Sequence, residues 1–231
     1  MKPFVFDPKS SDPQSVIGAV IPADVRVEGK RRFRKGHRFT AEDLPDLAKV
    51  EHPIHVIQIE PDEVHEDEAA IALAEAVSGQ GVERRKPVQS RVNMIADRKG
   101  LLRVDRDRVI ALNRMPGISV FTLLDGLAVV PGKNIAGAKI SPVAVKRSVL
   151  DEALALAAEP GPVVEVKPFT PKQVSVVTTE GLGEKVWDRF RSAVEQKIGW
   201  YGSTVTGFTD LIDDPDYVAG AITDAIDAGA D

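Results

Sequence analysis

The chain has 231 residues, a formal net charge of −5, 43% hydrophobic and 28% charged residues, and no cysteine. The lack of cysteine excludes disulfides, thiolate metal sites and a thiol nucleophile, so stability has to come from packing. The apolar runs are far too short to span a bilayer. The start, "MKPFVFDPKSSDP", lacks the continuous apolar stretch of a signal peptide, so we expect a cytoplasmic protein with no membrane segment.

The first segment with a clear pattern is apolar and then strongly basic. We expect strands at 15–21 and 24–28, followed by a turn. The run "RVEGKRRFRKGHR" at 26–38 holds seven Lys or Arg against Glu28. It is typical of a solvated hairpin or of an anion-binding one, and we favour the first because the run lacks the interleaved aromatic residues of single-strand binders. With the negative net charge, this argues against nucleic acid as a partner.

Local helix signals follow this basic run. Thr40 with Asp43 three residues later resembles a capping box and predicts a short helix at 41–50, interrupted near Pro45. The alternation in "IHVIQIE" predicts a strand at 54–60. The segment "DEVHEDEAAIALAEAVSG" places acids ahead of an Ala, Ile and Leu face and ends at Gly79, which predicts a helix.

From Val82 to about Val145 the sequence has short apolar runs broken by Gly, Pro and Asn, which predicts a small β-rich lobe with one helical segment at "DRDRVIALN". A short amphipathic helix capped by Ser148 should follow at 148–160. The Pro-rich "EPGPVVEVKPFTPKQ" then reads as a semi-rigid connector. We therefore expect an N-terminal β-rich mixed region at 1–168, with lobes at 15–80 and 82–158, and a separate domain at 169–231.

The last 60 residues show a regular order of elements. Strand and helix patterns alternate here: the β-branched run "QVSVVTT", the helical "GLGEKVWDRFRSAVEQKIGW", the strand-like "GSTVTGFTDL" and the helical "DDPDYVAGAITDAIDAGAD". This order predicts a parallel sheet with right-handed crossovers. The fold class expected is thus mixed α/β and α+β, with an incomplete parallel α/β domain at its end. Two parallel strands form a poor core, so we expect this domain to be truncated and its sheet edge to be paired with another chain.

Two sets of residues are candidates for binding an anion. Gly181, Gly183 and Lys185 lie in the loop "TTEGLGEK", between a strand and a helix, where backbone N–H groups can approach an anion; a plain tight turn explains the loop equally well. Arg91 and Asn93 lie on one side of a strand and can hold a carboxylate or phosphate, or cap a neighbouring loop.

We expect no metal site. The spacing of His52 and His55 invites one, but on a strand those two side chains face opposite sides. Trp187 and Trp200 are more typical of helix core than of a cofactor shelf.

Five blocks of the sequence, taken in order, resemble a known family. They are "GKRRFRKGHRFTAEDL", "EPDEVHEDEAAIALAEAV", "SRVNMIADRKGLLRVDRDRVIALNRMPGISVFTLL", "PGKNIAGAKISPVAV" and "QVSVVTTEGLGEKVWDRFRSAVEQKI". Together they are similar to bacterial molybdopterin-binding proteins, relatives of the molybdopterin molybdotransferases of molybdenum-cofactor synthesis. The resemblance covers about residues 15–231. It implies an N-terminal β-rich region followed by an α/β domain that binds the pterin phosphate through a Gly-rich loop.

The resemblance assigns Thr179, Gly181 and Gly183 to the edge of the pterin pocket. It assigns no catalytic residue, because "TTEGLGE" stands where molybdotransferases have a Thr-Gly-Asp-Glu-type loop, and because the family's later strand and Gly-containing loop do not follow residue 231.

The function expected is molybdopterin binding in molybdenum-cofactor biosynthesis or delivery. The resemblance implies a molybdotransferase-like enzyme at full length and a chain that, as given, is inactive and binds molybdopterin weakly or not at all. The alternative is a non-enzymatic scaffold or regulatory partner of a molybdoenzyme. A homo-oligomer is expected in either case.

Overall fold

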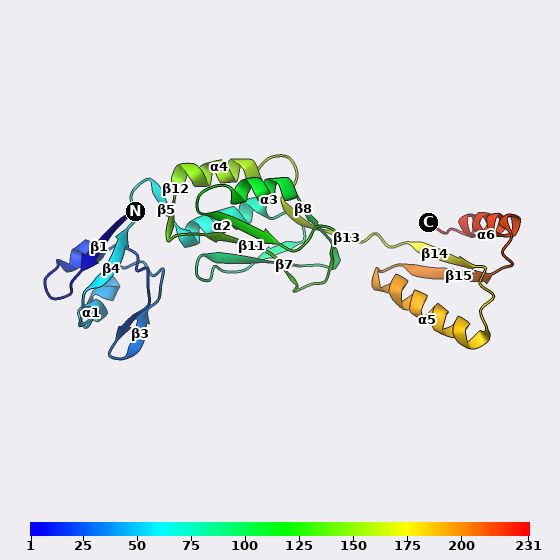
Figure 1. The fold of residues 1–231 in the computed structure, drawn as a ribbon, viewed down its shortest axis with the longest axis horizontal. Coiled ribbons are helices and arrows are strands. Elements are labelled where there is room, and N and C mark those ends of the chain that lie inside the picture. The colour runs from blue at the N-terminus through cyan, green and yellow to red at the C-terminus, as the bar shows by residue number, and fades with distance from the viewer. The chain divides into compact units, whose positions relative to one another are not determined.

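A computed structural model describes residues 1–231, except for the side chain of Arg31. The chain is mixed α/β, with six α-helices and many antiparallel strands in small sheets (Figure 1). It divides into two compact units, Met1–Lys167 and Pro168–Asp231. None of the described helices is both long enough and apolar enough to cross a membrane.

The first core of unit Met1–Lys167 is built by residues 6–56. Strand β1 (Lys2–Phe6) pairs antiparallel with β4 (Ile54–Gln58), and β2 (Val25–Val27) forms a hairpin with β3 (Lys30–Phe33). The predicted hairpin in the basic run is confirmed. The buried side chains of this core include three phenylalanines, Phe6, Phe33 and Phe39.

The strand predicted at 15–21 is wrong. Residues Pro13–Val16 form a 3-10 helix, with the Asp12 side chain accepting a hydrogen bond from the Gln14 amide at 2.9 Å. The apolar side chains that suggested a strand are nevertheless buried: Val16 at the end of this 3-10 helix, and Ala19 and Ile21 on the irregular backbone that follows it. The helix start at Thr40 is confirmed, because Thr40 and Asp43 form a reciprocal capping box. The helix is shorter than the predicted 41–50: it is 3-10 at Ala41–Asp43, continues as α1 (Leu44–Leu47) with Pro45 in the first turn of α1, and ends at Leu47.

The second core of this unit is a four-stranded antiparallel sheet covered by helices on one face. Its strand order is β6 (Val82–Arg84), β7 (Arg91–Ala96), β11 (Asn134–Ile140) and β9 (Ile118–Thr122). In Figure 1, α2 (Glu66–Val77), α3 (Arg106–Asn113) and α4 (Arg147–Ala157) lie on one side of β7 and β11, and α2 packs on both strands. Helix α2, grouped with the first lobe from sequence, thus belongs to the second core.

Two smaller pairings complete this core. Strand β8 (Gly100–Val104) lies between β10 (Ala128–Val129) and β13 (Val164–Pro168), and β5 (Glu63–His65) pairs with β12 (Ala144–Lys146). The connector predicted at 159–173 is therefore part strand, with Val163, Val164 and Val166 buried.

Two predicted helix starts need correction. Helix α2 begins at Glu66, because Glu63–His65 are a strand, and α4 begins at Arg147 with Lys146 rather than Ser148 at the N-cap.

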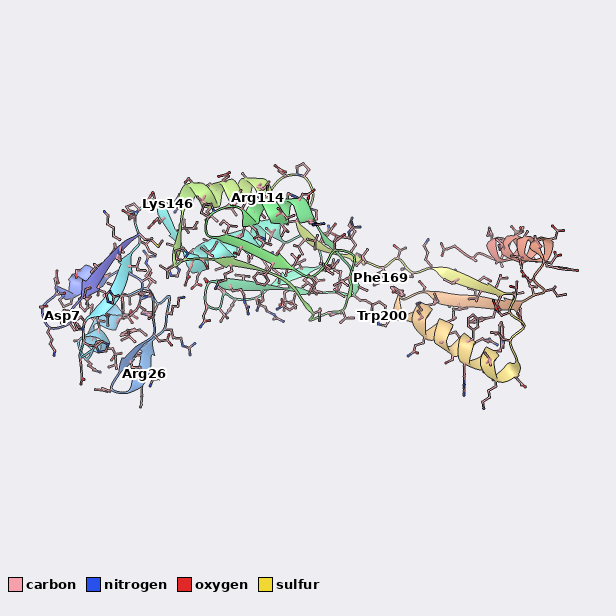
Figure 2. The ribbon with its side chains drawn as sticks, viewed as in Figure 1. Asp7, Arg26, Arg114, Lys146, Phe169 and Trp200 are labelled. Carbon is pink, nitrogen blue, oxygen red and sulfur yellow. The ribbon has the colours of Figure 1, made fainter. Side chains whose placement is uncertain are left out.

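Unit Pro168–Asp231 consists of β14 (Gln173–Thr178), α5 (Glu184–Trp200), β15 (Thr204–Asp210) and α6 (Pro215–Asp227). The two strands are parallel, with Thr178 opposite Asp210. Phe169 packs on Trp200 and Tyr201, with ring centroids 5.9 and 4.9 Å apart (Figure 2). Every residue of this unit is at least partly exposed, so neither tryptophan lies in a fully buried core.

Candidate functional site

The structure places the predicted site residues in two groups. Thr179, Gly181, Gly183 and Lys185 lie in and just beyond the loop that joins β14 to α5, whereas Arg91 and Asn93 lie on β7. The two groups belong to different units, and each is described by itself.

The β14–α5 loop lies at the carboxyl edge of the parallel pair. Because β14 and β15 run in the same direction, Thr178 and Asp210 end their strands at the same edge. The Leu211 amide donates to the Thr178 carbonyl oxygen at 2.9 Å, and the Glu180 amide donates to Thr178 Oγ1 at 3.3 Å. Gly181 has a φ of 58°, the left-handed conformation that glycine adopts at little cost. The chain thus turns sharply at Gly181 and enters α5.

The N-terminus of α5 has free backbone donors. Gly183 is its N-cap residue, and no side chain caps the helix. The Val186 and Trp187 amides both donate to the Gly183 carbonyl oxygen, at 2.9 and 3.0 Å. The amides of Glu184 and Lys185 are the remaining donors of the first turn, and they carry the positive end of the helix dipole. No heavy atom lies within 4 Å of a Cβ built on Gly183, so a ligand can approach these amides.

The second helix of the same unit shows the contrast. Helix α6 is capped by Asp214, whose Oδ1 accepts hydrogen bonds from the Asp216 and Tyr217 amides at 2.9 and 3.3 Å. A carboxylate therefore already occupies the α6 N-terminus, whereas the α5 N-terminus presents the same kind of donors to solvent. The sequence signal is plain, because Asp-Asp precedes α6, which begins at Pro215, and Gly-Leu-Gly precedes α5.

The charges around the α5 N-terminus oppose strong anion binding. Lys185 is exposed and forms no ion pair with any described side chain, which leaves its ammonium group available. Glu180 and Glu184 are also exposed, on the loop and in the first turn, and Asp210 ends β15 at the same edge. The site can hold an anion through backbone amides, but the carboxylates lower the affinity expected for a doubly charged group.

Arg91 and Asn93 lie side by side on the face of the four-stranded sheet that is turned away from the helices. Their neighbours Val92 and Met94 point into the core. In register, Arg91 pairs with Lys139 and Asn93 pairs with Gly137 on β11. Asn93 Oδ1 is buried and has no hydrogen-bond partner among the described atoms. Sequence reasoning missed Lys139, because a single sequence does not give the pairing of strands that lie forty residues apart.

The histidines do not gather into a site. His52 and His55 are exposed. His65 is buried, with Nε2 3.2 Å from the Gly36 carbonyl oxygen and Nδ1 accepting a hydrogen bond from the Asp67 amide at 3.2 Å. In the part of the chain that the structure describes, no three His, Cys, Asp or Glu residues are grouped so as to hold a metal ion.

Comparison with known proteins returned no relative: no protein-family model, no curated protein and no solved structure matches this chain.

Proposed function

We propose that the chain is a cytoplasmic molybdopterin-binding protein of molybdenum-cofactor biosynthesis or delivery. The ordered blocks of sequence that resemble this family support the proposal. So does the β-α-β-α order with parallel pairing of β14 and β15, which suits part of a parallel α/β molybdopterin-binding domain. The observation that carries it is the uncapped N-terminus of α5 behind a glycine-containing loop at the carboxyl edge of these strands.

In this proposal the phosphate of the pterin binds at the α5 N-terminus. The Glu184 and Lys185 amides donate to its oxygens, and the Lys185 ammonium group adds a charge-assisted contact. Thr179 and Gly181 line the turn that leads to the helix. The loop contributes position and charge and no covalent chemistry, so any metal insertion would depend on how the cofactor is held. Glu180, Glu184 and Asp210 weaken the site, and we therefore expect only weak binding by this chain.

Isothermal titration of the chain with molybdopterin under anaerobic conditions tests the proposal. The matched pair of variants is Gly183→Asp, which places a carboxylate where the phosphate would bind, and Gly183→Ala, which adds a methyl group in open space. We expect saturable binding by the wild type and by Gly183→Ala, and loss of binding by Gly183→Asp. Equal affinities of all three proteins would contradict the proposed site.

A second function, a scaffold or regulatory partner of a molybdoenzyme, is favoured by the apolar side chains exposed on unit Pro168–Asp231. Ile212, Tyr217 and Ile226 are 74%, 62% and 62% exposed. Where such side chains form one contiguous patch they are typical of an interaction surface, and the same patch would support a homo-oligomer. Sedimentation of the chain alone tests for the homo-oligomer, and sedimentation with a molybdoenzyme tests for the partner complex. A monomer that forms no complex would exclude both.

A further inference from the structure

The open face of the four-stranded sheet in unit Met1–Lys167 carries an unusual set of side chains. Helices cover the opposite face, where Val92, Met94, Val120 and Ala138 are buried. The residues that alternate with them on β7, β11 and β9 point to the open face: Arg91, Asn93, Gly137, Lys139, Ser119 and Phe121.

Two cations lie directly opposite each other on this face. Arg91 and Lys139 are register partners on β7 and β11. Like charges in this position destabilise a sheet. Lys139 Nζ contacts only neutral acceptors, the Ser90 Oγ at 3.2 Å and the Gln89 carbonyl oxygen at 3.3 Å. Among the described side chains, neither cation forms an ion pair. The repulsion between these two cations therefore destabilises the folded protein, and a bound anion would remove that repulsion.

An aromatic ring lies on the sheet next to this cation pair. Phe121 is opposite Gly137, and a Cβ built on Gly137 would lie 2.2 Å from the Phe121 Cζ. The ring can rest on the backbone only because residue 137 has no side chain. Phe121 is nevertheless 41% exposed. One side of the ring therefore lies against the sheet, and the rest is open to a second planar group.

A small cavity opens beside the same ring. Its volume is about 170 Å³, and it is lined by Phe121, Thr122, Leu123, Asn134, Ile135 and Ala136. An apolar cavity of roughly 150 Å³ can hold benzene, so this one has room for a single planar ring. Phe121 lies two residues, about 7 Å, along the strands from the row of the cation pair. Lys139 is on the neighbouring strand, about 5 Å across the sheet, and Arg91 is one strand further, about 10 Å across, so both long side chains must reach towards the ring.

We propose that this face binds a small aromatic phosphate. The ring stacks on Phe121 at the mouth of the cavity, and Arg91 and Lys139 share the phosphate oxygens. Two cations match the two charges of a phosphate monoester, whereas a carboxylate would neutralise only one of them. Asn93 Oδ1 is buried without a donor, two residues from Arg91 and across Gly137 from Phe121, and it would gain a partner from a ligand N–H or O–H after a small rotation of the side chain. The proposal rests on unit Met1–Lys167 alone and is independent of the site at α5.

The test is a titration of the full chain with phenyl phosphate, followed by the amide chemical shifts of β7, β9 and β11. Inorganic phosphate and phenol serve as the separate halves of the ligand. We expect saturable shifts that are largest at Arg91, Phe121 and Lys139, with phenyl phosphate binding more tightly than either half. No saturable shift, or tighter binding of inorganic phosphate than of phenyl phosphate, would overturn the proposal.

Three variants assign the two halves of the site. Arg91→Gln should weaken phenyl phosphate and inorganic phosphate equally, about tenfold. Phe121→Ala should weaken phenyl phosphate about tenfold and leave inorganic phosphate unchanged. Arg114→Gln, which removes a cation on the helix side of the sheet, is the control and should change neither (Figure 2).

A thermal melt separates this role from a structural one. Arg91→Gln removes a like-charge contact, so the free protein should melt at the same temperature as the wild type or higher. Weakened binding by a variant that melts lower would count against the proposal, as would equal effects of Arg91→Gln and Arg114→Gln on affinity.

Discussion

Replacing Gly183 with Asp should stabilise the chain and remove anion binding at α5. Gly183 has φ −64° and ψ 151°, a conformation open to any residue, and a Cβ there meets no heavy atom within 4 Å. The new carboxylate can accept the first-turn amides as Asp214 does at α6. Asp in place of Gly at an N-cap gains a few tenths of a kcal/mol, and its interaction with the helix dipole adds about as much again, roughly 0.5 kcal/mol in all.

The same carboxylate would repel a phosphate. A unit negative charge about 4 Å from another costs about 1 to 4 kcal/mol near a protein surface. The phosphate would also lose its hydrogen bonds to the amides that the carboxylate now occupies. A combined loss of about 2 kcal/mol corresponds to roughly a thirtyfold fall in affinity.

Gly183→Ala should differ from Gly183→Asp in both stability and affinity. Alanine is a poorer N-cap residue than glycine, so stability should fall slightly, but the amides stay free and affinity should be kept. The assay is a thermal melt by circular dichroism with a titration of each variant. For a unit of this size the stabilisation by Asp corresponds to about 2 to 4 °C. A stabilised Gly183→Asp protein with unchanged affinity would refute the assignment of the anion site to α5.

Three further outcomes follow from the structure. Arg108 is buried and donates to Asp105 Oδ2 and to four carbonyl oxygens at the end of α4 and beyond. Arg108→Met should therefore lower the free energy of unfolding, measured in urea, by about 3 kcal/mol. A decrease below about 1 kcal/mol would show that water replaces these contacts. Burial raises the pKa of Glu66, so the contribution of this carboxyl to stability is complete below its unfolded pKa and is lost as pH rises through its folded pKa. Glu66→Gln should therefore raise the melting temperature at pH 8 and not at pH 4. An equal change at both pH values would contradict this sign. Amide exchange should be faster in β14 and β15 than in β7 and β11, because unit Pro168–Asp231 has no fully buried residue; equal protection would mean that an interface covers this unit in solution.

The parts of the fold that depend on neighbouring residues could be predicted from the sequence. The Thr40 and Asp43 capping box forms as expected, and β14 to α6 follow the predicted order. Both depend on contacts within a few residues or on hydrophobic periodicity. The 3-10 helix at Pro13–Val16 also has a local signal, Asp12 followed by Pro13, but the apolar run after it suggested a strand instead.

The remaining errors come from pairings between distant segments. Glu63–His65 form a strand because Ala144–Lys146 lie beside them, about eighty residues later in the chain. Likewise, the Pro-rich stretch is part strand because it pairs with β8. A single sequence does not specify such partners. The same limit applies to the candidate sites. The loop at 178–185 is a local feature and could be proposed from the sequence. The position of Lys139 opposite Arg91, and of Phe121 over Gly137, depends on the register of three strands and could not be.

The most direct test of the molybdopterin site is the backbone amide spectrum of the chain during a titration with molybdopterin. We expect the largest shifts at the amides of Glu184 and Lys185, the free donors of α5, and little change at Asp216 and Tyr217, whose amides are already bonded to Asp214. Shifts confined to other parts of the chain, or no shifts at all, would contradict the assignment of pterin phosphate binding to this helix.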